Sequence, residues 1–285
     1  MSTVAESFRS TVTALTRALG SDSEGESAAR IIFEDVAGYD RKYLFINGDR
    51  SITDYMQERI DAVVAKVAGG EPVQYAVGTA RFMGNDYTVD RSVLIPRPET
   101  AGLVDIITGV YAGRSDLHVL DVGTGSGCIA ISLARALPFA TVDAVDISAE
   151  ALAVAETNAR KLGAKVAFTR CDILKAAGPS APTYDIIVSN PPYICTSERA
   201  DMDARVLDYE PSQALFVPDD DPLRFYRAIA RYAMGALRSG GRLFFEINER
   251  FPKEMHTLLE SEGYTDVDVQ RDYRGKYRFA IALKP

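Results

Sequence analysis

The chain has 285 residues, which is long enough for one large domain or for two of unequal size. Hydrophobic residues make up 47% of it and charged residues 25%, values typical of soluble globular proteins, which excludes a disordered chain, a collagen-like chain and a coiled-coil rod. The 32 basic residues are outnumbered by 40 acidic ones, so the net charge is −8. Because a groove that follows nucleic-acid phosphates usually needs a basic excess, this balance disfavours nucleic-acid binding.

The N-terminus and the cysteines indicate a cytoplasmic protein. Glu6 and Arg9 stand where a secretory signal would carry its apolar stretch, and no later segment approaches the ~18 uncharged apolar residues of a membrane span. The three cysteines form no CxxC pair and are expected to be free thiols. With two histidines and no close Cys/His cluster, we expect no metal site and no histidine-based triad.

Residues 1–72 are predicted to form a small helical domain. Apolar residues recur there at helical spacing, interrupted by the polar stretch 20–27 and by Asn47-Gly48. The clearest helix is predicted over residues 54–67, which end at two glycines. Its buried face would consist of Met56, Ile60, Val63, Val64 and Val67. Residues 73–95 then alternate between apolar and polar around Gly84-Asn85-Asp86, which predicts a β-hairpin linker.

From residue 96 onward the pattern predicts a doubly wound α/β domain, because short β-rich runs alternate with helical segments. The expected strands are residues 118–122, 142–147, 165–169, 184–189 and 242–247, and the expected helices are residues 127–136, 149–162, 223–238 and 252–262. Two last strand-like runs, 265–270 and 277–283, are joined by a polar turn. They predict a hairpin at the sheet edge, with one strand antiparallel to the rest.

A glycine-rich loop follows the first strand of this domain. Glycines lack a Cβ atom, so the backbone can turn tightly and approach a ligand, and the carboxyl ends of strands are where open α/β sheets bind ligands. The spacing is GxGxG rather than GxGxxG, and no Lys-Ser/Thr follows, which disfavours NAD and nucleoside triphosphates. A tight connection without a ligand is the plain alternative. The candidate residues here are Asp121, Gly123, Thr124, Gly125, Ser126 and Gly127.

The next two strands also end in carboxylates. Asp146 ends the second strand and could accept hydrogen bonds from ribose hydroxyls, as in NAD and S-adenosylmethionine sites. It could instead cap the following helix, although Ser148 is the better candidate for an N-cap. After the third strand, Asp172 could bind an adenine amino group while Ile173 packs against the ring. Together these residues predict an adenosine-containing cofactor.

The most informative motif is Asn190-Pro191-Pro192-Tyr193, at the end of the fourth strand. The prolines fix the backbone and remove two N–H donors, so a flat NH2 group could donate to the Asn190 side-chain oxygen and the Pro191 carbonyl while Tyr193 stacks on its plane. A Pro-Pro loop with a core tyrosine is the alternative, which the nearby glycine-rich loop disfavours. An amide or aryl nitrogen is a poor nucleophile that no side chain can deprotonate beforehand. Catalysis would therefore depend on aligning it at roughly 3 Å from a methyl sulfonium, an effect worth several kcal/mol.

With these motifs the chain resembles the bacterial release-factor glutamine N5-methyltransferases, the HemK-like family. The resemblance includes Pro72-Val73-Gln74-Tyr75, Gly78, Phe82, Gly84, the segment 93–100 (VLIPRPET), the GTGSG loop, NPPY, Tyr209-Glu210-Pro211, Ala214-Leu215-Phe216, Asp272, Gly275 and Arg278. The VLIPRPET segment is far more specific than NPPY, which also occurs in N6-adenine and N2-guanine nucleic-acid methyltransferases. Ala101, Val217 and Asn248 depart from the family pattern.

The resemblance implies a seven-stranded, Rossmann-like class I methyltransferase domain over residues 96–285, preceded by a helical domain that recognises the release factor and by a hairpin linker. It implies S-adenosylmethionine as cofactor, S-adenosylhomocysteine as product, and methylation of the glutamine in the release factor's Gly-Gly-Gln loop. By the same resemblance, Glu99 and Thr100 would line the cofactor side of the pocket. We expect no membrane partner and no stable nucleic-acid partner, since a base methyltransferase usually carries a basic recognition region. A non-enzymatic adaptor with this fold is disfavoured by the intact NPPY.

Overall fold

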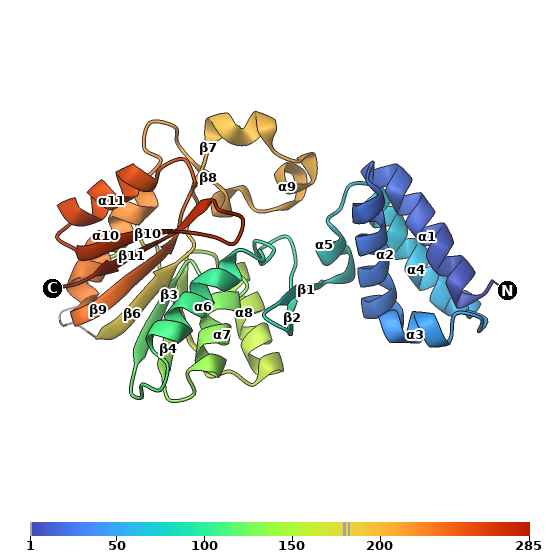
Figure 1. Ribbon diagram of the computed structural model, residues 1–285, viewed down its shortest axis with the longest axis horizontal. Helices are drawn as coiled ribbons and strands as arrows, with labels where there is room; N and C mark the ends of the chain where they lie inside the picture. Colours follow the sequence, from blue (N-terminus) through green and yellow to red (C-terminus); the bar gives the residue numbers. More distant parts are fainter. Residues whose placement is uncertain (1, 179–180, 182) are drawn as a thin grey trace. The chain divides into compact units, whose positions relative to one another are not determined.

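The computed structural model describes residues 2–178, 181 and 183–285, and its chain divides into two compact units (Figure 1). The N-terminal unit contains the chain up to Thr79 together with Asp203–Tyr209. The sheet unit contains Ala80–Met202 and Glu210–Pro285. The N-terminal unit thus includes a segment from far along the chain, which no local sequence pattern indicates.

The N-terminal unit is helical. Its helices are α1 (Val4–Leu19), α2 (Asp22–Ala37), α3 (Arg41–Ile46), α4 (Asp54–Ala68), α5 (Val73–Val77) and, from the distant segment, α9 (Ala204–Tyr209). The predicted face of α4 is confirmed, since Ile60 and Val67 are buried and its other three members pack against the same core. In α9, Arg205 pairs with Glu24 of α2 at 3.0 Å.

The predicted interruption over residues 20–27 is wrong in its extent. Only two residues separate α1 from α2, because Gly20 ends α1 in the left-handed conformation at φ 71° and the Ser21 side chain caps α2 by accepting from the Glu24 N–H. The acidic residues that follow Ser21 lie in the first turn of α2, where the helix dipole favours them. The predicted break at Asn47-Gly48 is confirmed, since α3 ends at Ile46.

The hairpin is shorter than predicted. Strands β1 (Thr79–Phe82) and β2 (Asn85–Thr88) flank a turn at Met83-Gly84, and both turn residues have positive φ, as a two-residue hairpin turn requires. Residues 73–77 form α5 instead of strand, because Gly78, at φ 78°, ends a short helix that begins after Pro72.

The sheet unit is built on one seven-stranded sheet in the described part of the chain, with the order β10-β11-β9-β6-β3-β4-β5. Its strands are β3 (His118–Val122), β4 (Thr141–Asp146), β5 (Ala167–Arg170), β6 (Tyr184–Ser189), β9 (Leu237–Glu246), β10 (Thr265–Arg271) and β11 (Tyr277–Leu283). β11 runs antiparallel to both of its neighbours, which confirms the hairpin at the sheet edge. β9 begins five residues earlier than predicted, at Leu237.

Helices cover both faces of the sheet (Figure 1). They are α6 (Thr100–Val110), α7 (Cys128–Ala136), α8 (Ala149–Leu162), α10 (Arg224–Ala236) and α11 (Pro252–Ser261). Because side chains alternate along a strand, Val119 and Phe244 belong to the core shared with α6, α7 and α8, whereas Leu120 and Phe245 belong to the core shared with α10 and α11. The predicted α/β fold is therefore confirmed, and its parallel strands β3, β4, β5 and β6 end at one common edge.

A small addition lies between β6 and α10. It contains β7 (Ile194–Cys195) paired with β8 (Phe216–Val217), and two 3-10 turns, Thr196–Asp201 and Ser212–Ala214. Val217, one of the departures from the family pattern, is buried in β8. Ala101, another departure, lies in α6 and packs against the sheet core.

Candidate active site

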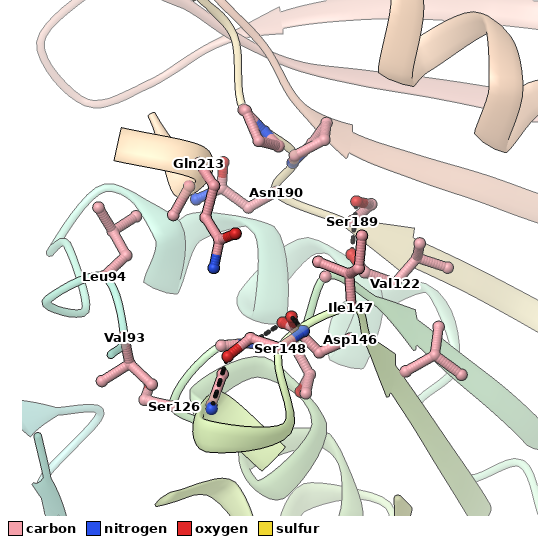
Figure 2. Close-up of a pocket in the computed structure, with 18 of the residues that line it drawn as sticks. Val93, Leu94, Val122, Ser126, Asp146, Ile147, Ser148, Ser189, Asn190 and Gln213 are labelled. Atoms are coloured by element: carbon pink, nitrogen blue, oxygen red, sulfur yellow. Dashed lines mark hydrogen bonds between the residues drawn. The ribbon is translucent and has the colours of Figure 1, made fainter. Parts of the chain in front are cut away.

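A cavity of about 260 Å³ lies at the carboxyl ends of β3, β4, β5 and β6 (Figure 2). Most predicted site residues line it: Thr100, Gly123, Thr124, Gly125, Ser126, Asp146, Asp172, Ile173, Asn190, Pro191 and Pro192. Four predicted residues, Glu99, Asp121, Gly127 and Tyr193, are not among its lining. The glycine-rich loop (residues 123–127) and the NPPY turn (residues 190–193) thus contribute to one cavity.

The glycine-rich loop needs its glycines for two different reasons. Gly123, Gly125 and Gly127 have φ values of 74°, 54° and 81°, a region that other residues rarely adopt. A Cβ at Gly123 or Gly125 would meet no atom within 4 Å, so the backbone there is open to a ligand. At Gly127 a Cβ would lie 2.9 Å from Ile131 Cδ1 and 3.1 Å from Ala155 Cβ. Gly127 is therefore a packing glycine behind the loop.

Asp121 lies beneath the loop and is fully buried. Its Oδ2 accepts hydrogen bonds from the Thr124 hydroxyl at 2.7 Å and from the Ala130 N–H at 3.2 Å. Its Oδ1 is buried without a hydrogen-bond partner among the described residues. Burial raises the pKa of Asp121 to about 7. The Asp121 carboxyl group supports the loop from the side away from the cavity. It would therefore influence a ligand only indirectly, through the conformation of the loop.

Asp146 ties together two segments that line the cavity. Its Oδ2 accepts from the Gly125 N–H and its Oδ1 from the Ser148 N–H, both at 2.9 Å (Figure 2). The Ser148 hydroxyl accepts from the Ala151 N–H at 3.0 Å, so Ser148 is the N-cap of α8, as predicted. Asp146 is thereby free of the capping role and lies on the cavity wall.

Asp172 and Ile173 follow β5 and also line the cavity. Lys175 pairs with Asp172 at 3.0 Å, and this hydrogen bond lowers the pKa of the Asp172 carboxyl. Ile173 packs against the core shared with α10 and α11. An anionic acceptor next to an apolar side chain suits a heterocycle with an amino group.

In the NPPY turn, Asn190 and Tyr193 have different surroundings. Asn190 lies on the cavity wall, and its Nδ2 donates to the Thr100 hydroxyl at 3.3 Å. Tyr193 packs against the core, and its hydroxyl donates to Glu246 Oε1 at 3.1 Å. Burial raises the pKa of Tyr193, which keeps the phenol protonated. The Tyr193 hydroxyl thus anchors the turn to the end of β9, and stacking of its ring on a substrate stays a prediction.

Asn248, which departs from the family pattern, also secures this turn. Its Nδ2 donates to the Tyr193 carbonyl and to Glu198, each at 3.0 Å. Asn248 is buried and lies two residues after the end of β9. The departure is therefore compatible with an ordered turn.

Glu246 is a site residue that sequence reasoning missed. It ends β9, is 1% exposed, and accepts from the Thr100 hydroxyl at 2.7 Å and from Tyr193. Burial raises the pKa of Glu246. The signal in the sequence is an acidic residue that closes the hydrophobic run Leu243-Phe244-Phe245, at the same edge as the other motifs.

Two further features were not anticipated. The Gln213 side chain extends into the cavity from the second 3-10 turn, near Asn190 (Figure 2). The buried Glu210 carboxylate pairs with Arg97 at 2.5 Å and accepts from the Ile95 N–H at 3.3 Å. Two segments that carry the family resemblance, around Arg97 and around Glu210, are thus joined at the cavity rim.

The described residues contain no cluster of three or more His, Cys, Asp or Glu side chains suited to a metal ion. None of the helices that could be described is long and apolar enough to cross a membrane.

Comparisons with known proteins agree with this geometry. Residues 9–78 match the PrmC N-terminal domain and residues 105–207 match the Methyltransferase small domain. The release factor glutamine methyltransferase of Bacteroides thetaiotaomicron is 46% identical, over 91% of this chain and 92% of its own. The chain belongs to the release factor glutamine methyltransferase family. The family member from Flavobacterium psychrophilum is 38% identical over 90% of this chain and 91% of its own.

Solved structures support the fold. A methyltransferase from Pyrococcus furiosus superposes with a TM-score of 0.52 at 18% identity, over 77% of this chain and 96% of its own. The 16S rRNA N2 G1207 methyltransferase of Thermus thermophilus, solved with AdoMet and guanosine, gives 0.53 at 22% identity, over 73% of this chain and 50% of its own. The class I methyltransferase fold expected from the family resemblance is confirmed.

Proposed function

We propose that this protein transfers a methyl group from S-adenosylmethionine to the side-chain amide nitrogen of a glutamine in a peptide chain release factor. Membership of the family supports the reaction and the protein substrate. The observation that carries the proposal is that Asn190 and Pro191 line the same cavity as the open glycine-rich loop. A cofactor on the loop and an amide at the turn would then meet in one cavity.

The cavity residues suit the adenosine part of the cofactor. The loop is open above Gly123 and Gly125, Asp146 is on the cavity wall for ribose hydroxyls, and Asp172 lies beside Ile173 for the adenine. When bound, S-adenosylmethionine supplies an electrophilic methyl group. Asp121 and Gly127 would act indirectly, since they shape the loop from behind it.

The turn suits an amide as methyl acceptor. An amide NH2 group has two hydrogens to donate, and the Asn190 Oδ1 and the Pro191 carbonyl are the acceptors that we assign to it. No side chain is basic enough to deprotonate an uncharged amide, so the reaction must proceed without a general base. The two contacts instead act by orienting the nitrogen lone pair. After transfer the nitrogen is strongly acidic, so its proton can leave to water. Tyr193 would contribute by supporting the turn.

The proposed partner is a release factor, and the family resemblance points to the glutamine of its Gly-Gly-Gln loop. Residues 1–72 are the proposed recognition domain and residues 73–95 the proposed linker to the catalytic domain, residues 96–285. Because release factors act in translation, we place the reaction in the cytoplasm. Nucleic-acid methylation is not favoured by the family or by the net charge of −8.

The test is a transfer assay with methyl-labelled S-adenosylmethionine. The purified protein is expected to label a bacterial release factor and to leave unlabelled the same factor whose Gly-Gly-Gln glutamine is replaced by alanine. Duplex DNA and ribosomal RNA serve as competing acceptors. Labelling of either nucleic acid in place of the release factor would overturn the proposal.

A further inference from the structure

We infer that Thr100 and Glu246 are positioning residues that determine which end of the Asn190 side-chain amide faces the substrate. The inference rests on the proposed function, because it concerns how the methyl acceptor is held. It assigns a role to Glu246 and changes the role of Thr100, which the family resemblance placed on the cofactor side.

The three side chains form a chain of hydrogen bonds from the cavity into the core. Asn190 Nδ2 donates to Thr100 Oγ1 at 3.3 Å, and the Thr100 hydroxyl donates to Glu246 Oε2 at 2.7 Å. Thr100 is 2% exposed and Glu246 1%, so both hydrogen bonds are largely shielded from water. The other carboxylate oxygen, Oε1, accepts from Tyr193.

The direction of these bonds is set at the buried end. Both carboxylate oxygens of Glu246 act as acceptors, Oε2 from the Thr100 hydroxyl and Oε1 from the Tyr193 hydroxyl, and leaving a buried carboxylate oxygen without a donor is costly. The single hydroxyl proton of Thr100 is therefore committed to Glu246, and Thr100 can offer Asn190 only its lone pairs. Only the NH2 end of the Asn190 amide can pair with lone pairs, so Oδ1 must point the other way, to the cavity.

This polarity matches the needs of the substrate. A glutamine NH2 group only donates, so the turn must present an acceptor to it. If the Asn190 amide rotated by half a turn, two donors would face each other in the cavity and two oxygens would face each other at Thr100. Acting through Thr100, Glu246 thus sets the direction of the hydrogen bond between Asn190 and the substrate amide, although Glu246 is not part of that bond.

Substitution of Thr100 separates this role from cofactor binding. Thr100→Val removes the hydroxyl with little change of shape, and we expect kcat on the release factor to fall about 10- to 100-fold while the Kd for S-adenosylmethionine, measured by calorimetry, changes less than about threefold. Thr100→Ser restores the hydroxyl and should recover most of the lost rate. If kcat is unchanged, or if Kd weakens tenfold while kcat is retained, Thr100 does not position Asn190 and the inference is overturned.

A matched control measures the purely structural cost of losing a buried hydroxyl. Ser132 is buried in α7 and bonded to Tyr87 at 3.0 Å, outside the cavity lining. Ser132→Ala should lower the unfolding midpoint without a selective loss of kcat. If Thr100→Val does not fold, the comparison of Thr100→Ala with Thr100→Ser replaces it, and equal kcat values would then contradict the inference.

A double-mutant cycle tests Glu246. Glutamine at position 246 can turn either end of its amide to Thr100, so Glu246→Gln should remove the bias and lower kcat several-fold. In the Thr100→Val background the same substitution should have no further effect. Independent, multiplicative losses would show that Glu246 does not act through Thr100. An inactive wild-type protein would instead contradict the proposed function, so the two failures are distinguishable.

Discussion

Each of the two loops that line the cavity is held by a buried acidic side chain. The two side chains differ in how many of their carboxylate oxygens accept a hydrogen bond. Asp121 supports the glycine-rich loop with one oxygen while the other has no partner among the described residues. Glu246 supports the NPPY turn, and both of its oxygens accept a hydrogen bond. Burial raises the pKa of both groups. The comparison indicates a turn whose buried acid has a donor for each oxygen and a loop whose buried acid has one oxygen without a donor among the described residues.

The largest effect is expected at the turn. Asn190→Ala removes the proposed amide acceptor, and kcat should fall about 100- to 1000-fold, the usual loss when one preorganised polar contact to the reacting group is removed. Cofactor affinity should change only a few-fold, because the loop and its acids remain. Single-turnover methylation and calorimetry measure the two quantities. Unchanged turnover would refute the role of Asn190.

The loss of stability caused by an added methyl group should depend on which glycine of the loop carries it. Gly127→Ala adds both a strained φ and a clash with Ile131 and Ala155, whereas Gly123→Ala adds only the strained φ. We expect Gly127→Ala to cost about 1–3 kcal/mol more of unfolding free energy than Gly123→Ala. Urea denaturation without cofactor measures the difference. Equal losses of unfolding free energy would mean that Ile131 and Ala155 can move to accommodate the added methyl group at little cost.

The unpartnered oxygen of Asp121 should make stability depend on pH. The unfolded carboxyl titrates near about 3.9, while burial raises the pKa of folded Asp121 to about 7. Between these values the folded chain holds a proton that the unfolded chain has released, so this residue's contribution to the free energy of unfolding falls as pH rises from about 4 to 7.

Asp121→Asn removes this titration. Relative to the wild type, the variant should therefore gain up to about 1.4 kcal/mol of stability per pH unit through that range, and the difference should level off above pH 7. Denaturation of both proteins without cofactor at several pH values checks this. Parallel pH profiles would show that Asp121 is ionised throughout.

The smallest effect is expected at the N-cap of α8. Ser148→Ala removes the side-chain oxygen that accepts from the Ala151 N–H and should cost about 1 kcal/mol of stability. The hydrogen bond from the Ser148 backbone N–H to the Asp146 carboxylate does not involve the Ser148 side chain and remains. Cofactor affinity should hence be nearly unchanged, and a tenfold weakening would show that the cap itself shapes the site.

The features that could be predicted from the sequence are those carried by local patterns. The GTGSG and NPPY motifs each follow a strand, and the topology of an α/β sheet brings strand ends together. Glu246 closes a hydrophobic run at the same edge, but its partner Thr100 lies 146 residues away, so the sequence does not reveal the hydrogen bond that gives Glu246 its role.

One local error has a physical cause as well. Residues 20–27 looked like a loop because Gly, Ser and Glu are common in loops. Ser21 and the acidic residues after it instead stabilise a helix start, where the same residue types are favoured.

The return of the chain at residues 203–209 makes the N-terminal unit discontinuous. A truncated protein that begins at residue 80 would keep α9 but lose Glu24, the partner of Arg205, and Gly69, whose carbonyl accepts from the Tyr209 hydroxyl at 3.4 Å. The two units are therefore not separable by a single cut. A chimera that exchanges the N-terminal unit between relatives would need to transplant both pieces, although more than a hundred residues of the sheet unit separate them in the chain.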